Sequence, residues 1–218
     1  MLRDKLIEKN IGSKNDFRWR SHEITRIEGF SDAVFAFAVT LLVISLEVPE
    51  TFDELLHGMS NFIAFGCGFT LLFFVWYNQY VFFRRYGLQD PVTITLNGAL
   101  LFVVLFFVYP LKFLFTILIK MFSGQSLLVT FPNGAVEPAI RGEQMQQLMT
   151  TYGLGYIAVF LVFALLYRHA YKKRAELELT ELEQYDTRTS IREALLSVAV
   201  GVLSVLIVSI GGSGWSAV

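Results

Sequence analysis

Long apolar segments constrain this 218-residue chain more than any other feature of its sequence. A membrane-crossing helix needs about 20 mostly apolar residues, because the hydrocarbon core is about 30 Å thick and a helix rises about 1.5 Å per residue. The composition agrees, with 54% hydrophobic residues and 21 phenylalanines, more than a soluble domain of this length can bury. The sequence therefore predicts an all-α, polytopic helical membrane protein with five clear transmembrane helices, at 27–48, 61–83, 91–119, 148–169 and 191–210.

The ends of these segments predict how the chain is divided and oriented. Residues 1–26 hold seven lysines and arginines and no apolar signal-peptide core, so we expect a basic cytoplasmic N-terminus. The connection at 48–60 is acidic, and basic connections alternate with acidic or sparsely charged ones along the chain. This alternation is expected for a multi-pass protein of the cell membrane with its N-terminus inside. Residues 27–218 then form a single transmembrane domain, with an internal loop at 170–190 that turns near Asp186. The tail after residue 210 leaves room for a short or truncated sixth span.

Several classes of function lack support in the composition. The net charge of −1 gives no sign of nucleic-acid binding. Cys67 is the sole cysteine, which excludes an internal disulfide, and the histidines at 22, 57 and 169 have no metal-ligand spacing. No His/Glu, Cys/His or Ser/His pair falls at one membrane depth, so we expect neither an enzyme nor a cofactor.

An aspartate stands at the head of the first apolar segment, in RIEGFSDAVFAFAVTLLVISLEVPE at residues 26–50. Ionisable groups within a span are costly and are usually paired or placed in a water-filled cavity. Asp32 could instead be a helix-start charge that the helix dipole favours. Other polar residues at the same expected depth favour a hydrogen-bonded cluster: Arg26, Ser31, Trp76 with Asn78 and Gln79, and Asn97.

One face of the first segment is apolar. On a helix with 100° per residue, a single stripe carries Ala33, Phe37, Leu41, Ile44 and Val48, with Thr40 beside it. Such a stripe can pack against other helices or line a pore, and periodicity does not separate the two.

The first three segments resemble a known family. The R-x3-F-S-D pattern at residues 26–32 is similar to the signature that opens the first helix of the transmembrane-protein-175 family, lysosomal potassium channels in animals with prokaryotic relatives. The similarity continues through AVFAFAVTLLVISLEVP, through Trp76 in FFVWYNQYVFFR, and through Asn97 and Pro110 in LNGALLFVVLFFVYP. Where the family often has a histidine three residues after the tryptophan, this chain has Gln79.

The resemblance implies a function and an assembly. Its prokaryotic members are six-helix subunits that form homotetramers, and the first helix of each lines a central pore. It implies a potassium-permeable cation channel in the lipid bilayer, with potassium ions as its partners. An apolar constriction would fall on Phe37, Leu41 and Ile44, and a selectivity layer on Thr40. A structural polar network would comprise Arg26, Ser31, Asp32, Trp76 and Asn97.

A secondary transporter is the alternative function. In that case Asp32 would be a coupling-ion or proton site, and Gly98 and Pro110 would break the third helix as transporters require. Saturating, gradient-coupled uptake would distinguish a transporter from a passive conductance.

Overall fold

The computed structural model describes residues 17–21, 23–44, 51–52, 62–122, 128–130 and 136–211. This part of the chain is almost entirely helical. Its elements are α2 (Arg26–Ile44), α4 (Phe62–Tyr86), α5 (Pro91–Phe122), β1 (Leu128–Thr130), β2 (Val136–Pro138), α6 (Gly142–Lys172) and α7 (Glu181–Gly211).

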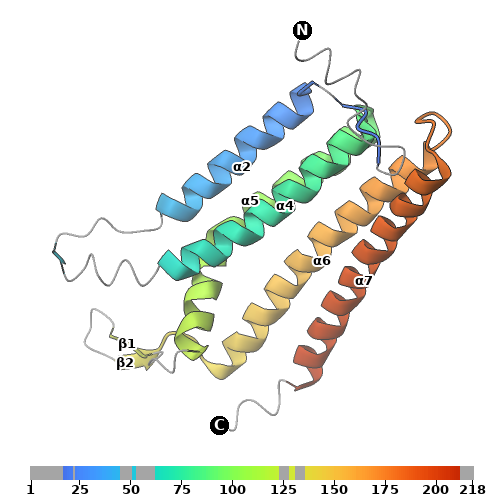
Figure 1. Cartoon of the computed structure of the whole chain (residues 1–218). Coiled ribbons are helices and arrows are strands. Elements are labelled where there is room, and N and C mark those ends of the chain that lie inside the picture. The colour runs from blue at the N-terminus through green and yellow to red at the C-terminus, as the bar shows by residue number, and fades with distance from the viewer. Residues whose placement is uncertain are drawn as a thin grey trace.

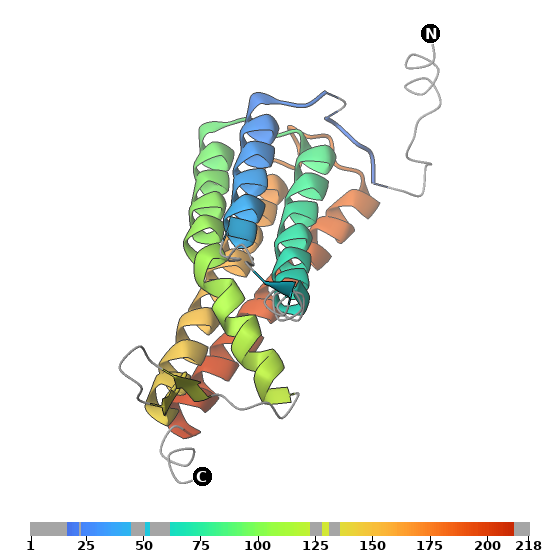
Figure 2. The ribbon, with the colours of Figure 1, turned by 90° about the vertical axis from the view of Figure 1, so that its left-hand side faces the viewer.

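The helices form two groups that lie side by side (Figure 1). α2, α4 and α5 pack against one another, and α6 and α7 form a long antiparallel hairpin that contacts α5 through α6. Figure 2 shows α2 in front of α4 and α5, with α6 and α7 behind them. One side of α2 is therefore left uncovered by the described residues.

Two helices begin with the same reciprocal cap. Ahead of α2, the backbone N–H of Thr25 donates to Glu28 Oε2 at 2.9 Å, and the N–H of Glu28 donates to Thr25 Oγ1 at 3.3 Å. Thr180 and Glu183 repeat this arrangement ahead of α7, at 3.0 and 3.3 Å. A Thr-x-x-Glu box satisfies backbone donors that a helix start leaves without partners, so it fixes where each helix begins.

The turn between α4 and α5 is also set by local chemistry. Gly87 follows α4 with φ +59°, a left-handed conformation that ends a helix and that glycine adopts without strain. Asp90 then accepts hydrogen bonds from the N–H groups of Val92 and Thr93, while Pro91 opens α5, where its missing N–H costs nothing.

Three described helices are long and apolar enough to cross a membrane: Pro91–Val108 of α5, Gln144–Lys172 of α6 and Glu181–Ile210 of α7. The prediction of five clear spans is therefore supported for three, while all five predicted segments contain a helix. The tail in which we allowed a sixth span lies outside the described residues.

The α6–α7 connection differs from the prediction. The chain turns at residues 173–180, and Asp186, where we placed the turn, lies inside α7. The Thr180–Glu183 cap explains this, because it starts α7 well before the apolar segment that hydropathy detects.

A cleft of about 920 Å³ separates parts of the two groups of helices. Side chains of α4, α5, α6 and α7 line it, from Tyr167 and Arg85 at one end to Met149 and Val208 at the other. Pro110 lies inside α5 beside this cleft, and Figure 2 shows α5 changing direction along its length. The hydroxyl of Tyr152 on α6 donates to the Pro110 carbonyl, which holds α6 against α5 there.

Candidate functional site

A buried polar cluster joins α2, α4 and α5. Asn97 Nδ2 donates to Ser31 Oγ at 2.9 Å, and Asn97 Oδ1 accepts from Gln79 Nε2 at 2.6 Å. Ser31 Oγ also donates to the carbonyl of Ile27 at 2.8 Å. All three side chains are buried, so these bonds replace hydration that the residues have lost. The cluster fixes how α2 is rotated against its neighbours.

Asp32 makes the second cross-helix contact, on the more open side of α2. Its Oδ1 accepts from the indole Nε1–H of Trp76 at 2.7 Å. Asp32 is exposed within the subunit and lies beside a shallow groove of about 290 Å³ between α2 and α4. Ala36, Phe73 and Trp76 also line this groove.

The structure thus brings together four of the five residues assigned to the network. Arg26 is exposed at the start of α2, and no contact with the cluster is found for it among the described residues. Of the two amides that follow Trp76, Gln79 joins the cluster, whereas Asn78 donates to the Phe74 carbonyl of its own helix. Gln79 thus lies in the cluster, as its expected depth indicated, although the network implied by the family resemblance did not include it.

Two of the residues expected at the pore, Phe37 and Thr40, lie on the uncovered side of α2. Phe37 has 56% of its surface exposed, and Thr40 is exposed, with its hydroxyl donating to the Ala36 carbonyl at 2.9 Å. Leu41 is partly buried at the edge of this face, against the core. Ile44 ends α2, and its side chain lies outside the described part.

A short segment ahead of α2 is fastened to the end of α4. We call residues 17–21 the N-terminal strap. The backbone N–H of Arg20 donates to the Arg84 carbonyl at 3.0 Å, and Arg84 Nη1 donates to the Ser21 carbonyl at the same distance. The buried ring of Phe17 packs edge-on against Tyr86, with 5.3 Å between centroids.

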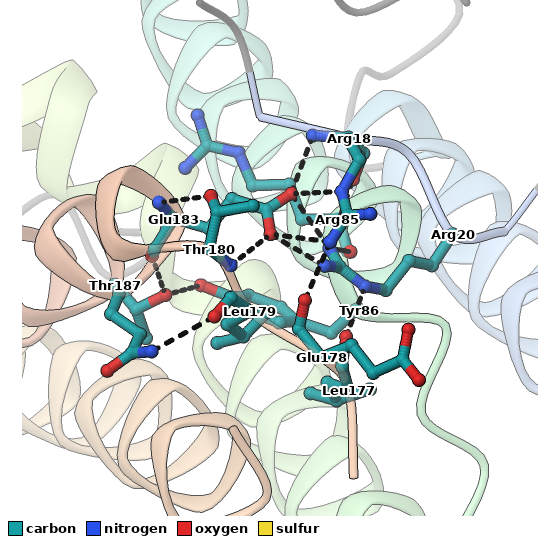
Figure 3. A network of polar contacts seen from close by, with 11 residues as sticks. Arg18, Arg20, Arg85, Tyr86, Leu177, Glu178, Leu179, Thr180, Glu183 and Thr187 are labelled. Atoms are coloured by element: carbon teal, nitrogen blue, oxygen red, sulfur yellow. Dashed lines mark hydrogen bonds and ion pairs between the residues drawn. The ribbon is translucent and has the colours of Figure 1, made fainter. Parts of the chain in front are cut away.

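The strap also meets α7, which sequence reasoning did not foresee. Figure 3 shows Arg18 and Arg20 converging on the carboxylate of Glu183. Next to it, Tyr86 and Thr187 join α4 to α7 through a buried hydroxyl–hydroxyl hydrogen bond of 2.8 Å. The Thr-x-x-Glu pattern could have located the start of α7, but no local signal pairs Glu183 with residues more than 160 positions away.

A second polar contact ties α6 to the turn before α5. His169 Nε2 lies 2.9 Å from Asp90 Oδ1. Partial desolvation raises the pKa of Asp90, but hydrogen bonds from Thr93 and His169 outweigh it and lower the pKa to about 2. Asp90 is therefore a carboxylate at neutral pH that caps α5 and holds α6 beside it.

These contacts define the class of protein. The polar groups tie membrane helices to each other, and the described residues hold no group of three or more histidines, cysteines and acids that could bind a metal. The buried polar side chains instead fix α2 against α4 and α5, and part of the α2 surface is exposed. The chain is a polytopic α-helical membrane protein whose polar residues position one partly uncovered helix.

Comparison with known proteins gives the family. A family profile described as "Endosomal/lysosomal potassium channel TMEM175" matches residues 26–108. A potassium channel of Marivirga tractuosa is 45% identical over 209 residues, which cover 93% of this chain and 82% of the relative. A potassium channel of Chamaesiphon minutus is 29% identical over 156 residues, covering 68% of this chain and 66% of the relative. The chain belongs to the TMEM175 potassium channel family.

A solved structure agrees with this assignment. The crystal structure of the potassium channel MtTMEM175, a T38A variant in complex with a nanobody–MBP fusion protein, superposes with a TM-score of 0.81. The two chains are 43% identical, and the match covers 92% of this chain and 86% of that one. The family consists of channels and not of enzymes, as the sequence predicted.

Proposed function

We propose that this chain is the subunit of a potassium-permeable cation channel whose pore is lined by α2. The observation that carries the proposal is the uncovered side of α2, on which Phe37 and Thr40 are exposed. The opposite side is fixed to α4 and α5 by buried hydrogen bonds. A helix held firmly from behind, with its other face free, is suited to line a pore between identical subunits, and we propose a homotetramer.

Side chains would then control permeation. Phe37, Leu41 and Ile44 are spaced by four and three residues, so each would form one apolar ring of four side chains around the axis. A narrow apolar ring resists hydration and closes a pore by dewetting. Thr40 would add a ring of hydroxyls that can replace part of the hydration shell of K⁺. Because ions would pass largely hydrated, we expect modest preference for K⁺ over Na⁺.

The polar network would support this pore without facing it. Ser31 and Asn97 are buried behind α2, and Asp32 is paired with Trp76. In the transporter alternative, Asp32 would bind and release a coupling ion or proton. It would then have to do so while its Oδ1 accepts the hydrogen bond from Trp76.

The deciding experiment is flux into liposomes that contain purified protein. A channel gives K⁺ tracer uptake that follows the electrochemical gradient and a current that is ohmic near zero voltage. Saturating uptake that stops when a proton or sodium gradient is collapsed would instead establish a transporter. Absence of any K⁺ flux from correctly assembled oligomers would refute the proposal.

Membrane orientation is part of the same proposal. We place the strap and the 173–180 turn on the cytoplasmic side, because the basic residues of the neighbouring helix ends gather there, among them Arg84, Arg85 and Lys172. In a Cys67→Ser background, Thr180→Cys should resist an impermeant thiol reagent applied to intact cells. Strong labelling from outside would reverse the orientation.

A further inference from the structure

The N-terminal strap, which is fastened to α4, also binds one acidic side chain of α7. Glu183 Oε1 accepts the backbone N–H of Arg18 at 2.9 Å and Arg18 Nε at 3.2 Å, while Glu183 Oε2 accepts Arg20 Nη2 at 2.7 Å (Figure 3). The Glu183 side chain is only 2% exposed. Removing its arginine partners would leave a buried carboxylate with too few partners, which is costly.

Arg20 extends the same link to other elements. Its Nε donates to the Leu177 carbonyl in the α6–α7 turn at 3.0 Å, and its Nη1 donates to the Arg85 carbonyl at the end of α4 at 3.2 Å. Gly87 lies against this residue, because a Cβ built on it would lie 3.5 Å from the Arg20 carbonyl carbon. The strap is therefore enclosed between α4, the 173–180 turn and α7.

This strap provides a short route from α7 to α2. α2 packs against α4 and α5, whereas α7 packs chiefly against α6. The cleft of about 920 Å³ further reduces packing between the two groups of helices. Along the chain, α2 begins five residues after Ser21, the last residue of the strap. A movement of α7 can thus reach the start of α2 through Glu183 and the strap.

We propose that Glu183 is a positioning residue that sets the balance between conducting and non-conducting positions of α2 by restraining the strap. This inference rests on the proposed pore function of α2. Glu183 touches neither the pore face nor the ion path, so its loss should alter how often the channel opens and leave the open pore as it is. We expect the ratio of open to closed time to change about tenfold or more, because the charge-assisted hydrogen bonds of both arginines to Glu183 are weakened together.

The test is single-channel recording of four reconstituted proteins: wild type, Glu183→Gln, Arg20→Gln and the double variant. Each single substitution should change the open probability, with unitary conductance and K⁺/Na⁺ selectivity unchanged. Because Arg20 and Glu183 act in part through each other, the double variant should change the open probability by less than the sum of the two single effects. Arg20→Gln also covers the case in which Glu183→Gln fails to assemble, since it leaves Glu183 paired with Arg18 and Thr180.

Two variants serve as matched controls. Glu181→Gln removes an exposed acid from the same helical turn, and Thr180→Ala weakens the α7 cap without touching the arginine contacts. Both should leave the open probability unchanged. An equal effect of Thr180→Ala would show that the α7 start matters and the strap does not, which would overturn the proposal.

Hydrogen exchange gives a measurement that does not depend on current. Exchange in residues 17–25 and in the first turn of α2 should accelerate in Glu183→Gln and stay unchanged in Glu181→Gln. No acceleration would overturn the strap proposal even if the channel conducts. If wild type does not conduct but exchange is still faster in Glu183→Gln, the proposed channel function and the gating role of Glu183 are both refuted. Only the restraint of the strap by Glu183 would then remain.

Discussion

Replacing Asn97 by leucine should destabilise the subunit by about 1–3 kcal/mol. Leucine has the same branching as asparagine, so the main loss is of two hydrogen bonds, at 2.9 Å to Ser31 and 2.6 Å from Gln79. Ser31 keeps its bond to the Ile27 carbonyl, but the Gln79 amide, in a residue only 2% exposed, loses its acceptor. An unsatisfied buried donor costs about 1–3 kcal/mol.

A second substitution separates this mechanism from general disruption. Removing both partners, in the double variant of Asn97→Leu and Gln79→Leu, leaves no unsatisfied amide and should recover much of the lost stability. Asn78→Leu is the matched control, because Asn78 bonds only within its own helix among the described residues. A denaturant titration of detergent-solubilised protein measures the stability of wild type and of these three variants. The reasoning would be refuted if adding Gln79→Leu lowered the stability of the Asn97→Leu variant further, as an independent destabilising substitution would.

Three further predictions concern the edges of the site. Asp32→Ala removes the acceptor of the Trp76 indole and should reduce the yield of assembled oligomer on size exclusion, with little change in K⁺/Na⁺ permeability ratio. Gly87→Ala forces a left-handed conformation on alanine and should cost about 1–2 kcal/mol in the same denaturant titration. The Asp90 carboxylate, whose pKa is lowered from 3.8 to about 2, stabilises the fold above about pH 4, and that stabilisation is lost as the pH falls through about 2. The stability gap between wild type and Asp90→Asn should therefore be about 2 kcal/mol near pH 5 and should close below pH 2. A gap that does not change with pH would show that the hydrogen bonds from Thr93 and His169 do not stabilise the Asp90 carboxylate.

Hydropathy located the helices because lipid-exposed segments must be long and apolar. It could not locate their ends, which depend on local hydrogen bonding. α7 begins at Glu181, ten residues before the apolar segment that we predicted from residue 191. The Thr-x-x-Glu patterns at Thr25 and Thr180 carry this information and were overlooked.

The polar cluster was predictable in part. Ser31, Trp76 and Asn97 share a membrane depth once the helices alternate in direction, and depth alone suggested that they meet. Which amide turns inward depends on helix rotation, and this separates Gln79 from Asn78. The contact of Glu183 with the strap depends on tertiary packing, so no local pattern could reveal it.

The most direct test of the central claim is bilayer recording of Leu41→Ala beside wild type and Thr40→Ala. If α2 lines the pore, the smaller side chain at Leu41 widens an apolar ring, lets water enter and raises K⁺ current per assembled oligomer. Thr40→Ala should lower the preference for K⁺ over Na⁺. If α2 is merely a packing helix, Leu41→Ala should instead destabilise the fold by about 2–5 kcal/mol and give less assembled protein with no gain in current. Unchanged current from correctly assembled Leu41→Ala and Phe37→Ala oligomers would contradict the account.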